Sequence, residues 1–184
     1  ERFRAAVSDG KGVIVYIEER IEWFFYYFDD AGALGVRAEL AQRLGDGLGV
    51  GAGAAGKIVG HFPVGREPQH VTPSWDMTRL YVNNTQSNSL TVIDPQSGRP
   101  VKTIPVTDPY NLYFTPDGTK AIVVAERYNR LDFRDPKTWK LIKSVPIPWS
   151  GVDHLGFSAD GGYLMASTEY SGFVVKVDVR TMSH

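Results

Sequence analysis

Short apolar runs alternate with clusters of turn-forming residues along most of the chain. Four such runs, at 80–82, 90–93, 121–125 and 173–177, are rich in Val, Ile, Tyr or Thr and are bounded by Asp, Gly, Pro or Asn. Residues of the first kind fit a pleated, half-buried surface, whereas those of the second kind favour the backbone angles of tight turns. The pattern therefore predicts a series of short β-strands joined by turns.

The pattern recurs at a nearly constant interval, which three sets of residues mark. The first set is an aspartate that precedes an apolar run, at Asp76, Asp117 and Asp160, spaced 41 and 43 residues apart. The second is an aspartate 18 residues later, at Asp94, Asp135 and Asp178. The third is a proline followed by a β-branched residue, at Pro63, Pro105 and Pro146. We expect these aspartates to form turns, because their side chains bond nearby backbone amides.

Each interval holds four strands: one before the first aspartate, one after it, one before the second aspartate and one at the proline. A repeat of this length with four short strands predicts a blade of a β-propeller, an all-β fold. The chain is expected to contain about four blade equivalents. The last is incomplete, because the sequence reaches His184 without a proline that would mark its fourth strand. Trp139 and Trp149 flank the outer strand and are expected to pack between blades.

Residues 1–56 fit the template less regularly than residues 57–184, so we treat them as a separate N-terminal unit. Within this irregular blade equivalent, residues 12–30 are expected to form a β-hairpin. An insertion follows, in which 36–44 has helix-forming composition and the composition of 45–56 is typical of a flexible glycine-rich linker. The alternative is an amphipathic helix at 16–29. In that case strand 58–64 is available to close the last blade.

Composition narrows the partners of the protein. The formal net charge is -1, and 42% of the residues are hydrophobic. Such a chain can bury a core, but it has no long-range attraction for nucleic acid. No apolar run is long enough to span a bilayer. Cysteine is missing, which excludes disulfides and thiolate metal sites.

Catalytic motifs are missing from the sequence. It contains no phosphate-binding glycine loop, no HExxH and no GxSxG, and the glycine-rich segment is not a dinucleotide fingerprint. Hydrolase, kinase and Rossmann oxidoreductase functions are therefore disfavoured. No reaction and no cofactor is implied by any motif.

A ring of polar residues is expected on the innermost strands. Counting back four residues from the Ser or Thr before each first aspartate gives one residue per unit, namely Arg4, His70, Asn111 and His154. Because the innermost strands of a propeller converge on its channel, these side chains should form a ligand site there. His70 and His154 are also candidate metal ligands, since imidazole is the commonest protein ligand of transition metals.

A second set of polar residues is expected at the rim of this ring. Gln69, Tyr110 and Asp153 precede the ring residues directly, and Glu126, Arg127 and Glu169 occupy the loops between the second and third strands. Asp153 and His154 are not expected to form a catalytic relay, because adjacent strand residues point to opposite faces. Trp75 lies in a turn, where an exposed indole would indicate a contact surface.

One blade carries a sequence resemblance. Tyr81-Val82-Asn83-Asn84, followed by SNSLTVIDPQSG and KTIPV, resembles the YVTN-type β-propeller repeat, a family related to the propeller of haem-containing nitrite reductases. The resemblance covers about 57–184, although 123–126 and 165–168 depart from the tetrapeptide. It implies a propeller fold more firmly than an activity. Members of the family are often extracytoplasmic, so it also implies a periplasmic or secreted protein.

These observations favour a non-catalytic propeller scaffold that binds a protein or a small ligand at the channel mouth and blade loops. One alternative is a metal- or cofactor-dependent propeller enzyme, or its accessory protein, that uses His70 and His154. Another is an excised or recombined propeller fragment that self-associates through an unpaired blade edge.

Overall fold

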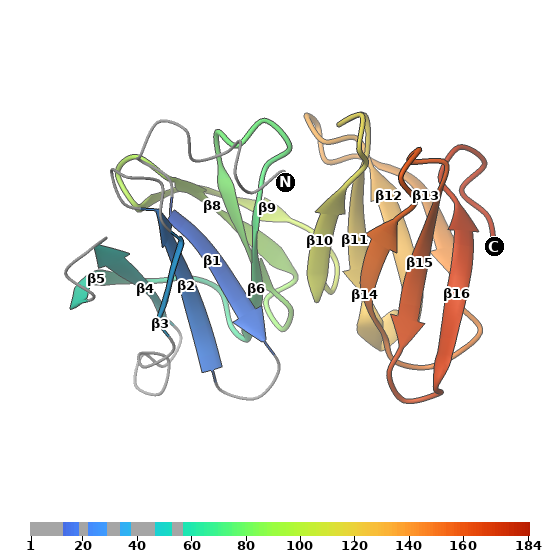
Figure 1. Cartoon of the computed structure of the whole chain (residues 1–184), viewed down its shortest axis with the longest axis horizontal. Helices are drawn as coiled ribbons and strands as arrows, with labels where there is room; N and C mark the ends of the chain where they lie inside the picture. The colour runs from blue at the N-terminus through green and yellow to red at the C-terminus, as the bar shows by residue number, and fades with distance from the viewer. Residues whose placement is uncertain (1–12, 19–21, 29–33, 38–46, 53–56) are drawn as a thin grey trace.

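The computed structural model describes residues 13–18, 22–28, 34–37, 47–52 and 57–184, and side chains from residue 62 onward (Figure 1). Its N-terminal strands are β1 Val13–Glu18, β2 Glu22–Phe28, β3 Leu34–Arg37, β4 Gly47–Ala52 and β5 Lys57–Pro63. They are followed by β6 Pro68–Pro73, β7 Leu80–Asn84, β8 Ser89–Asp94, β9 Arg99–Pro105, β10 Asn111–Phe114, β11 Ala121–Ala125, β12 Arg130–Arg134, β13 Leu141–Pro146, β14 Val152–Phe157, β15 Tyr163–Thr168 and β16 Phe173–Asp178. The β-rich fold predicted from the sequence is confirmed.

The repeat appears as three successive antiparallel sheets. Strands β6 to β9 and β10 to β13 each form a four-stranded sheet in chain order, and β14 to β16 form a three-stranded sheet (Figure 1). In each, the first strand precedes the first aspartate, and the third strand ends at the second aspartate or, in β12, directly before it. Two fourth strands, β9 and β13, end at Pro105 and Pro146. The predicted blade pattern is therefore confirmed, strand by strand.

The N-terminal unit differs from its prediction in several respects. The hairpin is confirmed, because β1 pairs with β2 from Val13 opposite Tyr27 to Glu18 opposite Glu22, and the helix at 16–29 is wrong. Strand β5 pairs with β4 rather than with β2 or β16, so it completes neither predicted blade among the described strands. The flexible linker is wrong over Gly47–Ala52, which is β4, and of the predicted helix, 36–37 lie in β3 while 38–44 fall outside the described residues.

The first aspartates form turns, as predicted. Asp117 accepts hydrogen bonds from the Thr115 hydroxyl at 2.6 Å and from the Thr119 backbone N–H at 3.0 Å. Because these donors stabilise the ionised carboxylate, the pKa of Asp117 falls to about 2. The following residue, Gly118, has φ +70°, which glycine adopts without steric cost. The same bonds hold Asp76 to Ser74 and Asp160 to Ser158.

Apolar residues fill the space between neighbouring sheets. Ile122, Leu131 and Phe133 of the middle sheet belong to one buried cluster with Leu164 and Val177 of the last sheet. Burying one such side chain contributes about 1.5–3 kcal/mol to folding. A second cluster joins the β6–β9 sheet to the other face of the middle sheet. Its buried members are Tyr81, Leu90, Val92, Ile104, Val106, Leu112, Ala121, Val123 and Trp139.

The two tryptophans that flank the outer strand differ. Trp139 is buried and packs edge to face on Tyr81 of the preceding sheet, with ring centroids 5.0 Å apart, which confirms its predicted role between blades. Trp149 remains 36% exposed and contacts Phe173, so its predicted burial is wrong. No helix in the described ranges has the length and apolarity needed to cross a membrane.

Candidate ligand-binding site on the inner strands

The first strands of the three repeat sheets lie side by side. Strand β10 contacts both β6 and β14. Each of these strands begins after a residue in the left-handed region, with φ +54° at Glu67, +46° at Asp108 and +81° at Gly151. The ring residues follow these positions by three residues in every case, at His70, Asn111 and His154. The matched backbone geometry thus brings matched side chains to one place.

Two of the three strands carry a β-bulge at the ring residue. In β6 the register shifts between Pro68, opposite Asn84, and Val71, opposite Val82, so that Gln69 and His70 face one residue. The register of β14 shifts in the same way between Val152 and Leu155, around His154. Bulges re-aim a side chain and are enriched beside functional sites. Here they orient both histidines.

Asn111, Tyr113 and His154 form a connected polar group. The Asn111 amide Nδ2 donates to the Tyr113 hydroxyl at 2.9 Å and lies 3.2 Å from His154 Nδ1. The Tyr113 hydroxyl is itself 3.3 Å from that ring nitrogen. Because Asn111 Oδ1 accepts the Leu112 backbone N–H at 2.8 Å, the orientation of the amide is fixed. The group is therefore tied together from neighbouring sheets.

His70 completes the group from the other side. Its ring lies edge to face against His154, with centroids 5.3 Å apart, and against Tyr110, with centroids 4.9 Å apart. Nδ1 donates to the Tyr110 carbonyl oxygen at 2.9 Å, whereas Nε2 is buried without a hydrogen-bond partner among the described residues. Burial lowers the pKa of His70 to about 4, so the ring is neutral at physiological pH. We call His70, Tyr110, Asn111, Tyr113 and His154 the inner-strand cluster.

The hydrogen bonds assign the tautomer of each histidine. His70 carries its proton on Nδ1, because a carbonyl oxygen can only accept, and Nε2 is left as an acceptor. His154 Nδ1 accepts from the Asn111 amide, so in the neutral ring its proton is on Nε2. The cluster thus offers one ring acceptor and one ring donor. Such a pair suits a ligand that can both donate and accept a hydrogen bond.

The structure brings three of the four predicted ring residues together, while Arg4 lies outside the described residues. The metal role predicted for His70 and His154 stays a prediction, and no group of three or more His, Asp or Glu side chains suited to a metal occurs within the described part.

Tyr110 contributes its carbonyl and ring to the cluster. Gln69 is half-buried and donates to Glu67. Asp153 is buried, and its carboxylate accepts from the Ser167 hydroxyl at 2.6 Å.

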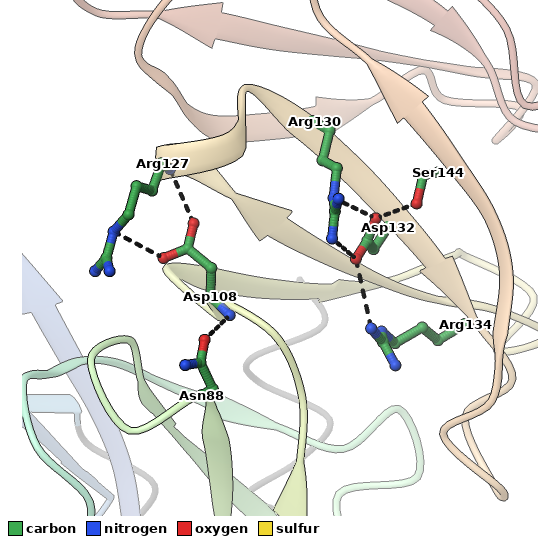
Figure 2. A network of polar contacts seen from close by, with 7 residues as sticks. All are labelled: Asn88, Asp108, Arg127, Arg130, Asp132, Arg134 and Ser144. Atoms are coloured by element: carbon green, nitrogen blue, oxygen red, sulfur yellow. Dashed lines mark hydrogen bonds and ion pairs between the residues drawn. The ribbon is translucent and has the colours of Figure 1, made fainter.

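The rim residues make contacts to the backbone and to neighbouring turns. Glu126 and Arg127 lie in a 3-10 turn, Glu126–Tyr128, and the backbone N–H of Arg127 donates to Asp108 at 2.9 Å (Figure 2). The backbone N–H of Glu169 donates to the Gly151 carbonyl at 2.7 Å. Trp75 is 51% exposed, and its indole N–H donates to the Pro116 carbonyl in the next turn. Recognition of a partner by these residues stays a prediction.

A buried ionic network, which no sequence pattern predicted, lies beside the rim. Asp132 is fully buried and is bonded by Arg130, Arg134 and Ser144, with its Oδ1 3.0 Å from Arg130 Nε (Figure 2). Removing one partner of such a group leaves an uncompensated buried charge. The network therefore has a structural role within the middle sheet.

Two further residues near the ring escaped prediction. Tyr113 follows Asn111 by two residues and thus shares its strand face, a signal that strand alternation could have supplied. Asn83 lies on β7, and the register places it across from the bulge that holds Gln69 and His70. Its signal is an amide in a strand whose five residues are all buried.

Comparison with known proteins identifies the repeat. A family model described as YNCE-like beta-propeller matches residues 40–181. No curated protein matches the chain significantly. Many solved structures share its fold.

Among these is Kuenenia stuttgartiensis hydrazine synthase, with a TM-score of 0.66, 22% identity, and coverage of 96% of this chain and 48% of that one. A functionally unknown protein from Desulfotomaculum acetoxidans has a TM-score of 0.61, 14% identity, and coverage of 92% and 55%. Dihydro-heme d1 dehydrogenase NirN, solved in complex with DHE, has a TM-score of 0.58, 19% identity, and coverage of 94% and 44%. The chain thus spans about half the length of these structures, and the likeness concerns the fold.

Proposed function

Because the chain belongs to the YNCE-like β-propeller family, we propose that it acts as a propeller scaffold that binds a small polar ligand at the inner-strand cluster. The observation that carries the proposal is the convergence of His70, Asn111 and His154 from three successive sheets. Their side chains are ordered by the fold before any ligand arrives, so little conformational entropy is lost on binding. The surrounding loops with Arg127 and Glu169 offer contacts for a larger partner.

The polarity of the cluster also supports binding. His70 is 5% exposed, and its unpaired Nε2 carries the cost of a buried polar atom, about 1–3 kcal/mol. A ligand that donates to this nitrogen offsets that cost. Half-buried His154 gives the cluster an edge toward solvent. Function-related groups of this kind often reduce stability in the unliganded protein.

A ligand-dependent melting screen tests the proposal. A library of neutral and charged metabolites should raise the melting temperature of the native protein for at least one compound class. His70→Ala and His154→Ala should each reduce that shift, whereas Gln86→Ala, at an exposed position in a turn, should leave it unchanged. An identical shift in all three variants would place the ligand elsewhere.

A second candidate is a metal- or cofactor-dependent function. It is favoured by His70, whose Nδ1–H bond to a backbone carbonyl leaves Nε2 available in the manner of metal-ligating histidines. One fold neighbour, NirN, is described as a complex with DHE. Visible absorption or stoichiometric metal in the purified protein would support this function. A colourless, metal-free protein that binds the compounds above would support the scaffold.

Self-association and an extracytoplasmic location complete the proposal. The outer face of the last sheet exposes Met165 at 41% and Val174 at 62%, which supports contact with a second sheet. Light scattering across a concentration series should then reveal a defined oligomer, and a monomer at all concentrations would exclude self-association. The location rests on the family resemblance, and fractionation of cells that express the full-length protein tests it.

A further inference from the structure

Two neighbouring amides on β7 differ sharply in their bonding. Asn84 donates from Nδ2 to Thr91 Oγ1 at 2.9 Å and to Ser89 Oγ at 3.3 Å, and so ties β7 to β8, although its Oδ1 has no hydrogen-bond partner within the described part of the chain. Asn83 is also fully buried, but neither its Oδ1 nor its Nδ2 has a hydrogen-bond partner among the described residues. A buried amide without partners is uncommon in native proteins and calls for an explanation.

The repeat shows that the fold does not require an amide at this position. Val124 of β11 stands 41 residues after Asn83 and packs into an apolar cluster. Ser167 of β15 stands 43 residues further on and donates to Asp153. One blade thus fills the position with an apolar side chain and another satisfies its polar group locally. Asn83 does neither.

Asn83 lies next to the inner-strand cluster. The β6–β7 register sets it across from the bulge of Gln69 and His70. His70 Nε2 is likewise buried and unpaired within the described part of the chain. His70 and Asn83, on adjacent strands, therefore carry three unsatisfied atoms between them: the ring acceptor of His70, the amide acceptor of Asn83 and the amide donor of Asn83.

We propose that Asn83 and His70 form a recognition site for a neutral ligand group that both donates and accepts hydrogen bonds, namely a hydroxyl or a carboxamide. This inference rests on the proposed function and names the ligand class of the same cluster. A ligand O–H or N–H donates to His70 Nε2 or Asn83 Oδ1, and a ligand oxygen accepts from Asn83 Nδ2.

Charged ligands fit this site poorly. A carboxylate has no proton to donate and would face the lone pairs of His70 Nε2 and Asn83 Oδ1. An ammonium group has no acceptor for the Asn83 Nδ2 protons. Either ion would also lose its hydration on entering a buried position, which a neutral group does at far lower cost.

The first test compares Asn83→Val with Asn84→Val. Valine is the residue that the matched position 124 already carries, so Asn83→Val should fold and should melt about 2–4 °C higher than the native protein, because it removes an unsatisfied amide. Asn84→Val should melt lower, since it breaks bonds to Ser89 and Thr91. A fall in melting temperature for Asn83→Val similar to that for Asn84→Val would show that the Asn83 amide is structurally bonded, and would overturn the inference.

The second test uses four probes of one shape: isobutyramide, isobutanol, isobutyrate and isobutylammonium. Long-range proton–nitrogen NMR on the native protein should show His70 as the Nδ1–H tautomer, and the amide and alcohol should shift its Nε2 signal. The carboxylate and the ammonium should not. Binding of the effective probe should weaken about tenfold in Asn83→Val, as expected for the loss of one good hydrogen bond.

The results separate this inference from the proposed function. Ligand binding that depends on His70 and His154 but prefers ions, or that survives Asn83→Val, overturns the ligand class alone. An Nε2–H tautomer of His70, or no response to any probe at 100-fold the protein concentration and above, up to the solubility limit, overturns it as well. A screen without any histidine-dependent ligand overturns the proposed function itself.

Discussion

The β10–β13 sheet and the β14–β16 sheet follow one sequence template but differ in burial. All five residues of β11 are buried, since one face packs on the β6–β9 sheet and the other on the last sheet. In β15 burial alternates, and Met165 is 41% exposed. The turns of both sheets are nevertheless built alike around Asp117 and Asp160. Turn geometry is thus set by local residues, whereas the burial of a strand face is set by its neighbour.

Truncation of matched side chains should give the largest difference between the two sheets. Phe133 and Lys176 both stand two residues before the second aspartate, but Phe133 is fully buried and Lys176 is exposed over the Tyr163 ring. Phe133→Ala should cost about 3–5 kcal/mol in the free energy of unfolding, because it opens a cavity. Lys176→Ala should cost about 0.5–1 kcal/mol, the value of a surface cation–π contact. Urea unfolding measures both, and equal losses would mean that the last sheet is covered in solution.

The same division between local and tertiary effects explains what could be predicted. The first aspartates bond donors within two residues, so their spacing, together with the apolar runs between them, located the turns and the strands. Bonds between distant segments left no such pattern. Ser144 reaches Asp132 from the next strand, and the β4–β5 pair depends on which strands meet in space. His70 and His154 were found because the repeat fixes their positions, whereas Asn83 breaks the repeat and was missed.

Two glycines with the same backbone conformation sharpen the comparison at the turns. Gly118 and Gly172 both have φ +70°, but an added Cβ at Gly118 would lie 2.4 Å from the Trp75 ring, whereas at Gly172 it would meet nothing within 4 Å. Gly172→Ala should therefore cost only the backbone strain, about 1 kcal/mol. Gly118→Ala should cost about 2–3 kcal/mol, because the indole must also move. Urea unfolding provides the values.

A double-mutant cycle checks the cause of that difference. In a Trp75→Ala background, Gly118→Ala should cost no more than Gly172→Ala does in the native protein. If the larger cost persists without the indole, contact between the turns of successive sheets is not its source.

Two aspartates should give the smallest effects, separated by their dependence on pH. The pKa of Asp117 is lowered from 3.8 to about 2, so its ionised form adds stability above pH 3.8, and this stability is lost as pH falls toward about 2. Burial raises the pKa of Asp108 above 3.8 despite its contacts with Arg127, so ionisation there reduces stability at neutral pH and the penalty disappears as pH falls through the raised pKa.

Asp117→Asn should thus destabilise the protein at pH 7 and have little effect near pH 2, measured by urea unfolding. Asp108→Asn should be neutral or stabilising at pH 7, since asparagine tolerates its φ of +46° and its amide oxygen can still accept the Arg127 N–H. If both variants are destabilised at pH 7 but not near pH 2, Asp108 behaves like the turn aspartates. A carboxylate buried between sheets would then not differ from one exposed at a turn.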